Sequence, residues 1–280
     1  MLMSTQANRY AHQLLVARAN AQQIACLSQS EALTIADGYD IAKAIADIRI
    51  AEGETPVGRK IGFTNSKIAV QYGQREPISE PIWSHIFDTT VRYSQDNHGV
   101  QSLKGAVQPR IAPEIVFMLG KTPPANATLE NIADCIEWIA HGFELVTCPF
   151  KNWKFEAVDA IAAFGLHGTL ILGEPHMLSS ATRRHLSEIL PDASMSLSVS
   201  ERGEVSLQSA GFGSDVLGSP VHALWHLHQL LKTQPQFAPL AAGELIATGT
   251  LTDAYPIKPG QTWSTAFSGV TLPGLTVSLV

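Results

Sequence analysis

The sequence predicts an α+β fold, in which a small helical N-terminal region precedes a β-rich main body. The first fifty positions contain a run without glycine or proline, and then apolar residues at steps of three and four, which is typical of helices. The later chain breaks into short apolar runs separated by turn residues, which is typical of strands. These strands do not alternate regularly with long helices, so a doubly wound parallel sheet is disfavoured.

Two helices are predicted in the N-terminal region, over residues 5–27 and 38–52. In the second helix the apolar residues recur so that they stack on one face. Asp37 is expected to cap the start of that helix, and Gly53 stands where a C-terminal glycine would end it.

Two further helices are predicted over residues 129–141 and 220–232. Three isoleucines share one face of the first, and Gly142 follows as its stop. Ser219 and Pro220 open the second as an N-cap and a first-turn proline.

Short strands are predicted where uncharged apolar runs end at turn residues. They cover residues 115–119, 143–146, 169–172, 244–248, 262–267 and 270–279. Apolar residues also alternate with serine from Met195 to Val199, and E-R-G-E then turns the chain back. This pattern predicts a hairpin with one face in water.

The composition excludes several classes of protein. With 45% hydrophobic and 16% charged residues, the chain is too apolar to be disordered. Its net charge of −6, without a Lys/Arg cluster, disfavours nucleic acid as a partner. No signal peptide or membrane-spanning run is visible, so a cytoplasmic location and no membrane are expected. Cys26, Cys135 and Cys148 are far apart, which favours reduced thiols.

Two glutamates lie in apolar segments, where burial of a carboxylate costs free energy. Glu114 leads directly into an apolar strand, and Glu144 lies beside another apolar pair. A buried carboxylate must be paired, protonated or bound to a cation, so the two together could bind a hard divalent ion such as Mg²⁺. The alternative for each is a strand-end glutamate that reaches water or an arginine.

Other polar residues lie in apolar or glycine-rich settings, and each has two interpretations. Lys60, between glycines, could bind a substrate carboxylate or be a surface lysine. Asp159 could orient a lysine or water, or cap a short helix. His167 could be a catalyst or a hydrogen-bonded structural residue. Gly249 and Thr250 could offer donors to an anion.

Taken in order, six segments resemble the fumarylacetoacetate hydrolase superfamily, in particular its 2-keto-4-pentenoate (2-hydroxypenta-2,4-dienoate) hydratase branch. They are RKIGFTN (59–65), PRIAPEIVFMLG (109–120), HGFELV (141–146), DAIAAFGLHGTLILG (159–173), GSPVHALWHL (218–227) and GELIATGTLTDAYPIKPGQTW (243–263). The resemblance implies a mixed β-sheet roll, divided into a helical N-terminal region, 1–75, and a β-rich catalytic domain, 76–280, or forming one continuous domain. It also implies a homo-oligomer.

The resemblance implies a Mg²⁺ or Mn²⁺ site built from an E-x-E strand and one acidic residue downstream. Glu114 and Glu144 match two of these ligands, but Ala112 stands where the first glutamate is expected. Residues two apart on a strand face the same side, so one metal-facing carboxylate is missing. Three explanations stay open: water replaces it around a weakly held metal, the position has been altered for another purpose, or no metal is needed.

The implied activity is hydration of a small 2-hydroxy-dienoic or 2-oxo-enoic acid through a metal-stabilised enolate. Its predicted catalytic residues are Lys60, Asp159 and His167, and its predicted substrate-binding residues are Gly249 and Thr250. Ala163 and Phe164 replace an Asp-Asn pair that is usual in hydratases. One alternative is therefore a decarboxylase or a C–C hydrolase on a related 2-oxo acid. The other, favoured by Ala112, is an inactive homologue that binds a small acid or a partner subunit.

Overall fold

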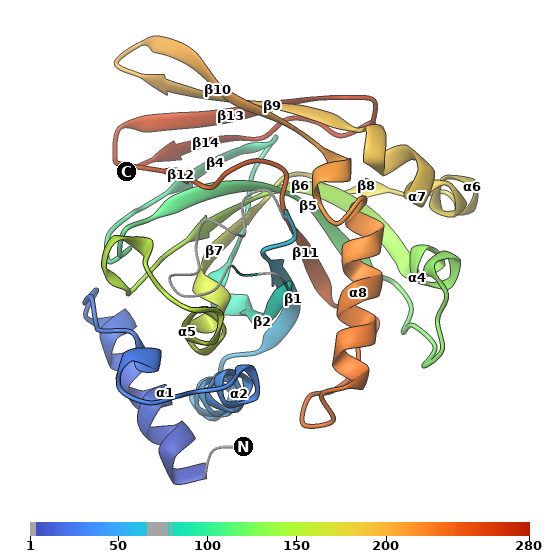
Figure 1. Cartoon of the computed structure of the whole chain (residues 1–280). Coiled ribbons are helices and arrows are strands. Elements are labelled where there is room, and N and C mark those ends of the chain that lie inside the picture. The colour runs from blue at the N-terminus through green and yellow to red at the C-terminus, as the bar shows by residue number, and fades with distance from the viewer. Residues whose placement is uncertain (1–3, 66–77, 79) are drawn as a thin grey trace.

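The computed structural model describes residues 4–65, 78 and 80–280. Within these residues, two β-sheets form the body of the protein, and helices lie around the larger one (Figure 1). The strand order is β2-β1-β11-β5-β6-β7-β3 in the larger sheet, with β12 and β8 added at β5 and β6, and β10-β9-β13-β14-β4 in the smaller. Parallel and antiparallel pairs occur in both sheets, so the predicted α+β fold with mixed sheets is confirmed.

The strands of the larger sheet are β1 (Pro56–Gly62), β2 (Ile82–Phe87), β3 (Val91–Tyr93), β5 (Arg110–Leu119), β6 (Ile136–Val146), β7 (His167–Leu172), β8 (His176–Met177), β11 (Leu245–Thr250) and β12 (Tyr255–Pro256). Those of the smaller sheet are β4 (His98–Gln101), β9 (Ser194–Glu201), β10 (Glu204–Phe212), β13 (Gln261–Ser268) and β14 (Thr276–Leu279). The helices are α1 (Ser4–Ala19), α2 (Ile35–Ala51), α4 (Leu129–Cys135), α5 (Ala157–Ala162), α6 (Ser180–Arg184), α7 (Leu186–Ile189) and α8 (Pro220–Lys232).

Strands β5 and β6 form the centre of the larger sheet. They pair antiparallel from Arg110 opposite Val146 to Leu119 opposite Ile136. Nearly all of their side chains are buried, because both faces of the sheet are covered. Residues on these two strands therefore face enclosed space on either side, and the next strand, β11, joins β5 to β1.

The N-terminal helices differ from the prediction at their ends. Helix α1 ends at Ala19 rather than at residue 27, because Ala21 adopts a positive φ of 50° and Ile24 pairs as a β-bridge with Phe150. The N-cap of α2 is Thr34, not Asp37; the Asp37 side chain completes a capping box from the third helical position. Figure 1 shows α1 and α2 side by side, with α5 between α2 and the sheet.

The predicted helix 129–141 is wrong in its second half. Helix α4 ends at Cys135, and Ile136 is already the first residue of β6. Ile132 lies in α4, but Ile136 and Ile139 belong to a strand that is buried on both faces, where apolar residues need no alternation. Strand β6 therefore absorbs the predicted stop residue Gly142 and the predicted strand 143–146.

The C-terminal half follows the prediction more closely. Helix α8 has the predicted bounds and the N-cap Ser219, and β9 and β10 form the predicted hairpin. Side chains of β9 alternate between buried and partly buried, whereas those of β10 are mostly exposed, because β10 is the edge strand. The predicted strand 270–279 is shortened to β14, since the chain bends at Gly269, which has a φ of 80°, and residues 271–275 belong to no strand.

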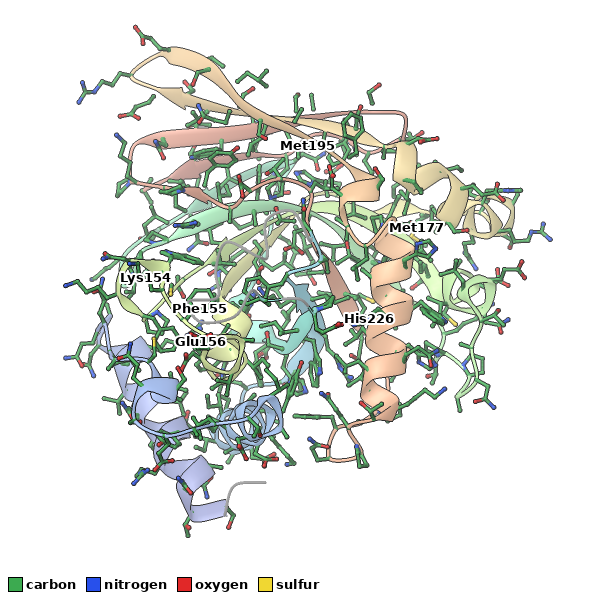
Figure 2. The ribbon with its side chains drawn as sticks, viewed as in Figure 1. Lys154, Phe155, Glu156, Met177, Met195 and His226 are labelled. Atoms are coloured by element: carbon green, nitrogen blue, oxygen red, sulfur yellow. The ribbon has the colours of Figure 1, made fainter. Side chains whose placement is uncertain are left out.

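One large hydrophobic cluster extends from Ala7 of α1 to Leu279 of β14. It includes Met195 of β9, and side chains fill the space around this residue between the two sheets (Figure 2). The predicted domain boundary at residues 75 and 76 lies outside the described residues, so the division into two domains stays a prediction. Among the described helices, none combines the length and the apolar character that crossing a bilayer requires.

Candidate active site

Four predicted site residues from four strands meet in one cavity of about 70 Å³. Lys60 comes from β1, Glu114 from β5, Glu144 from β6 and Thr250 from β11. The rest of its described lining is mainly apolar and includes Phe63, Ala112, Val146, Trp153, Leu166 and Ala254, together with Thr64 and Asn65. A water molecule needs about 10–15 Å³ by a comparable measure, so the cavity can admit several waters or the acidic end of a small molecule.

Lys60 is buried rather than on the surface, with 4% of its area exposed. Its Nζ lies 3.0 Å from Glu144 Oε2. Gly165 leaves room for the long side chain, because a Cβ there would lie 3.3 Å from Lys60 Cε, closer than an ordinary van der Waals contact. The surface interpretation of this lysine is therefore excluded, and the ammonium group faces the cavity.

Glu144 connects the lysine to a histidine behind it. Its second oxygen, Oε1, lies 2.7 Å from Nδ1 of His167, whose Nε2 lies 2.9 Å from the Thr90 hydroxyl. Burial opposes ionisation of Glu144, but Lys60 and His167 outweigh it and lower the pKa of the carboxyl. Burial lowers the pKa of His167, which favours the neutral ring, and the Glu144 carboxylate accepts a hydrogen bond from its Nδ1.

Glu114 lines the same cavity, but its pKa is shifted in the opposite direction. Burial, and then the negative charge of Glu144, raise the pKa of this carboxyl well above its ordinary value. The backbone N–H of Gly249 donates to Glu114 Oε2 at 3.0 Å. Gly249 has a φ of +106°, and a Cβ there would lie 2.0 Å from the Thr64 hydroxyl oxygen, so only glycine fits this position.

Two threonine hydroxyls at the cavity differ in availability. Thr250 Oγ1 donates to the carbonyl of Thr252 at 2.7 Å, so the predicted substrate-binding hydroxyl is already committed to a turn. Thr64 Oγ1 is buried and has no hydrogen-bond partner among the described residues. Sequence reasoning assigned Thr64 no role, although it lies in the RKIGFTN segment; only the unpaired hydroxyl singles it out.

Asp159 is not part of this cavity. Its carboxylate accepts from the backbone N–H and hydroxyl of Ser28, at 3.0 and 2.7 Å, and from the Glu156 N–H at 2.9 Å. Glu156, labelled in Figure 2, precedes α5, and the two residues form its capping box. The expectation that Asp159 orients Lys60 or a water therefore lacks a geometric basis, and its helix-cap alternative describes the contacts.

Phe164, one of the two departures from the hydratase pattern, is occupied in packing. Its ring lies beneath two guanidinium groups, 4.6 Å from Arg18 and 5.4 Å from Arg49. Arg18 also donates to the His167 carbonyl at 2.7 Å. Phe164 and Ala163 do not line the cavity of Lys60, whereas the residues that follow them, Gly165 and Leu166, do.

A family profile described as fumarylacetoacetate (FAA) hydrolase C-terminal matches residues 58–274. The chain belongs to the fumarylacetoacetate hydrolase family. Within this family it resembles enzymes of two named activities. A 2-hydroxyhexa-2,4-dienoate hydratase of Comamonas testosteroni is 28% identical over 85% of this chain and 84% of the relative. A 4-oxalocrotonate decarboxylase of Pseudomonas sp. is 28% identical over 90% and 91%.

A solved structure of this family shares the whole fold. A 4-oxalocrotonate decarboxylase from Pseudomonas putida G7, complexed with magnesium and adipate, covers 100% of this chain and 99% of its own, with a TM-score of 0.85 and 24% identity. A fumarylpyruvate hydrolase from Pseudomonas aeruginosa, in complex with Mn²⁺ and pyruvate, matches at a TM-score of 0.51 and 16% identity, over 79% of this chain and 88% of its own. The predicted fumarylacetoacetate hydrolase type of roll is confirmed.

A divalent cation, as held by those solved relatives, fits the described residues of this family member poorly. Ala112 supplies no oxygen ligand. Both oxygens of Glu144 are already hydrogen-bonded, one to Lys60 and one to His167. One oxygen of Glu114 accepts from Gly249. In the described part of the chain, no group of three or more His, Cys, Asp or Glu side chains is placed to hold a metal ion.

Proposed function

We propose that this protein hydrates a small 2-hydroxy-dienoic acid, by way of the corresponding 2-oxo-enoic acid, in the cavity of Lys60, Glu114 and Glu144. The observation that carries the proposal is that the pKa values of Glu114 and Glu144 are shifted in opposite directions. One buried glutamate has a raised pKa and the other a lowered pKa, beside one ammonium group. Neighbouring carboxyls with pKa values pushed apart form an acid and base pair, which proton transfer along a conjugated acid requires.

The proposed reaction has two proton-coupled steps. The enol hydroxyl of the 2-hydroxy-dienoic acid gives its proton to the Glu144 carboxylate, and Glu114 delivers a proton to the far carbon, which gives the 2-oxo-enoic acid. Water then gives a proton to the Glu114 carboxylate and places its hydroxyl on the double-bond carbon farther from the oxo group. Glu144 returns its proton to the nearer carbon, so both carboxyls end in their starting states. Glu114, held protonated, delivers the proton to carbon, and the Lys60 ammonium stabilises the negative charge that develops on the 2-oxygen.

Glu144 and His167 position the lysine in this scheme. The Glu144 carboxylate holds Lys60 Nζ at 3.0 Å, and the His167 ring fixes the other oxygen of that carboxylate. His167 does not line the cavity, so we assign it a positioning role rather than the catalytic role expected from the sequence. The apolar walls limit the access of bulk water, which strengthens the charge interactions.

Decarboxylation of a related 2-oxo acid is the second candidate. It is favoured by the similarity to the 4-oxalocrotonate decarboxylase of Pseudomonas sp., which is as high as the similarity to the hydratase and covers slightly more of the chain. Loss of CO₂ from such an acid also passes through an enolate, which the same lysine would stabilise. The two reactions differ in their products.

Product analysis separates these functions. The purified protein is incubated with 2-hydroxypenta-2,4-dienoate and, separately, with 4-oxalocrotonate, and the products are identified by proton NMR. We expect a 4-hydroxy-2-oxo acid from the first and no CO₂ from the second. CO₂ release would establish the decarboxylase instead, and no product from either would favour an inactive homologue. Glu114→Gln, which keeps the shape but cannot supply the carboxyl proton, serves as the matched control.

A further inference from the structure

We propose that the Lys60 ammonium occupies the cation position of this site, so that the protein binds a 2-oxo acid without a divalent metal. The inference rests on the proposed function for the class of ligand. It concerns a property in which this chain departs from its solved relatives, which were crystallised with Mg²⁺ or Mn²⁺.

A positive charge, the Lys60 ammonium, already lies beside the Glu144 carboxylate. Lys60 Nζ lies 3.0 Å from Glu144 Oε2, with side-chain exposures of 5% and 2%. A buried ion pair at this distance places a fixed positive charge directly against the carboxylate. A metal ion that approached the same oxygen would have to displace the ammonium or be repelled by it.

A carboxylate that could bind a metal is missing at position 112. Ala112 lies directly opposite Glu144 in the β5–β6 pair, two residues from Glu114 on the same strand. A side chain at this position faces the cavity, and Ala112 is part of its lining. The chain therefore presents a methyl group at a cavity-facing position next to both glutamates. Removal of one anionic ligand and retention of one cation both favour an anionic ligand over a metal.

Hydrogen-bond donors of two residues remain available for an anionic ligand. The lysine ammonium has three N–H donors, and Glu144 takes one of them among the described residues. The buried Thr64 hydroxyl, on the same cavity, has no partner there and can donate to a second acceptor. A 2-oxo acid carries adjacent carboxylate and carbonyl oxygens, which can accept hydrogen bonds from these two donors of one cavity.

Binding of Mn²⁺ alone tests the cation part, because it needs no substrate. The full-length protein is titrated with MnCl₂, and free Mn²⁺ is counted by electron paramagnetic resonance. We expect only weak Mn²⁺ binding by wild type, and the same by Lys43→Met, a control at a lysine that pairs with Asp47 away from the cavity. Lys60→Met, which keeps the length but removes the charge, should bind Mn²⁺ at least tenfold more tightly. Tight binding by wild type, or equal affinity in folded Lys60→Met, would overturn the inference.

Calorimetric binding of 2-oxopentanoate tests the ligand part. The acid is titrated into wild-type protein in EDTA and, separately, in excess MgCl₂. We expect the two dissociation constants to agree within about twofold, and Lys60→Met to weaken binding in EDTA at least tenfold. Binding only with MgCl₂ would overturn the inference and leave the proposed substrate class standing. No binding in either buffer would overturn the substrate class and the inference together. The wild-type arms decide the matter even if Lys60→Met fails to fold.

Discussion

Ala112 and Glu144 lie directly opposite each other on the antiparallel strands β5 and β6. Cβ atoms of such cross-strand pairs are about 4.5–5.5 Å apart, so side chains at the two positions meet on one face of the sheet. A carboxylate at position 112 would thus adjoin Glu144 and, two residues along the strand, Glu114. This relationship makes position 112 the most direct place to alter the preference of the cavity for cations.

Ala112→Glu should therefore tighten Mg²⁺ binding at least tenfold, or by roughly 1.4 kcal/mol. The new carboxylate adds one negative charge and one oxygen ligand to a cation that prefers about six oxygens. Calorimetric titration with MgCl₂ measures the change, and Ala112→Gln is the control for size without charge. If Ala112→Glu stays folded with unchanged affinity, Glu114 and Glu144 have a structural role and cannot form a metal site.

Lys60→Ala should abolish turnover while the fold is retained. The substitution removes the only ammonium group among the described residues of the cavity and leaves the Glu144 carboxylate without its ion pair. The loss of the substrate's ultraviolet absorbance measures turnover, and circular dichroism measures the fold. Lys43→Ala, on the exposed side of α2, should retain wild-type turnover. Wild-type turnover by Lys60→Ala would remove this lysine from the mechanism.

Asp159→Ala should lower the free energy of unfolding by about 2 kcal/mol, because it leaves partly buried donors of Ser28 and Glu156 without their acceptor. Urea denaturation measures the loss. The exposed Asp134→Ala should change stability by no more than about 0.5 kcal/mol. The KM of the remaining folded enzyme should be unchanged; a specific loss of kcat with normal stability would return Asp159 to the catalytic residues.

The stability of the protein should fall as the pH decreases from about 6.5 to about 4, partly because of His141. Burial lowers the pKa of this histidine from 6.5 to about 4, and its ring is enclosed by Phe143 and Phe267. In this window the unfolded chain takes up a proton that the folded chain does not, so unfolding is favoured by up to about 1.4 kcal/mol per pH unit. Denaturation of His141→Phe at several pH values should show a shallower slope, and an equal slope would contradict the assignment.

The protein should form a homo-oligomer. Large apolar side chains are exposed on the edge strand β10, where Val205 and Leu207 are 73% and 68% exposed. Such a strand offers both unpaired backbone groups and apolar surface to a second copy. Light scattering at micromolar concentration should report a dimer or a multiple of it, whereas a strict monomer would contradict the prediction.

The sequence predicted the elements that end at clear turn residues. Helix α8 begins at Ser219-Pro220, and the β9–β10 hairpin turns at Arg202-Gly203, as expected. It failed at the junction of α4 and β6. Isoleucines at three- and four-residue steps fit one face of a helix and also a strand that is buried on both faces, and only the long-range pairing with β5 distinguishes these structures.

The sequence predicted only part of the candidate site, because the site also depends on contacts between distant segments. Glu114 and Glu144 are unusual in their local sequence, since each is a charge inside an apolar strand. The burial of Lys60 depends on Gly165, far along the chain, which leaves room for its side chain. The position of Asp159 depends on Ser28, which is equally remote. Contacts between distant segments of this kind have no local pattern that a sequence could display.

The direct passage from α4 into β6 limits how the length of this protein can vary. Cys135 ends the helix and Ile136 begins the strand, and the Cys135 carbonyl accepts from the N–H groups of Gly120 and Lys121. One inserted or deleted residue between this junction and Glu144 would turn the glutamate to the opposite face of the sheet. Between β5 and β6, a change in length should thus be tolerated in the loop at residues 121–128, which absorbs it without rotating the strand.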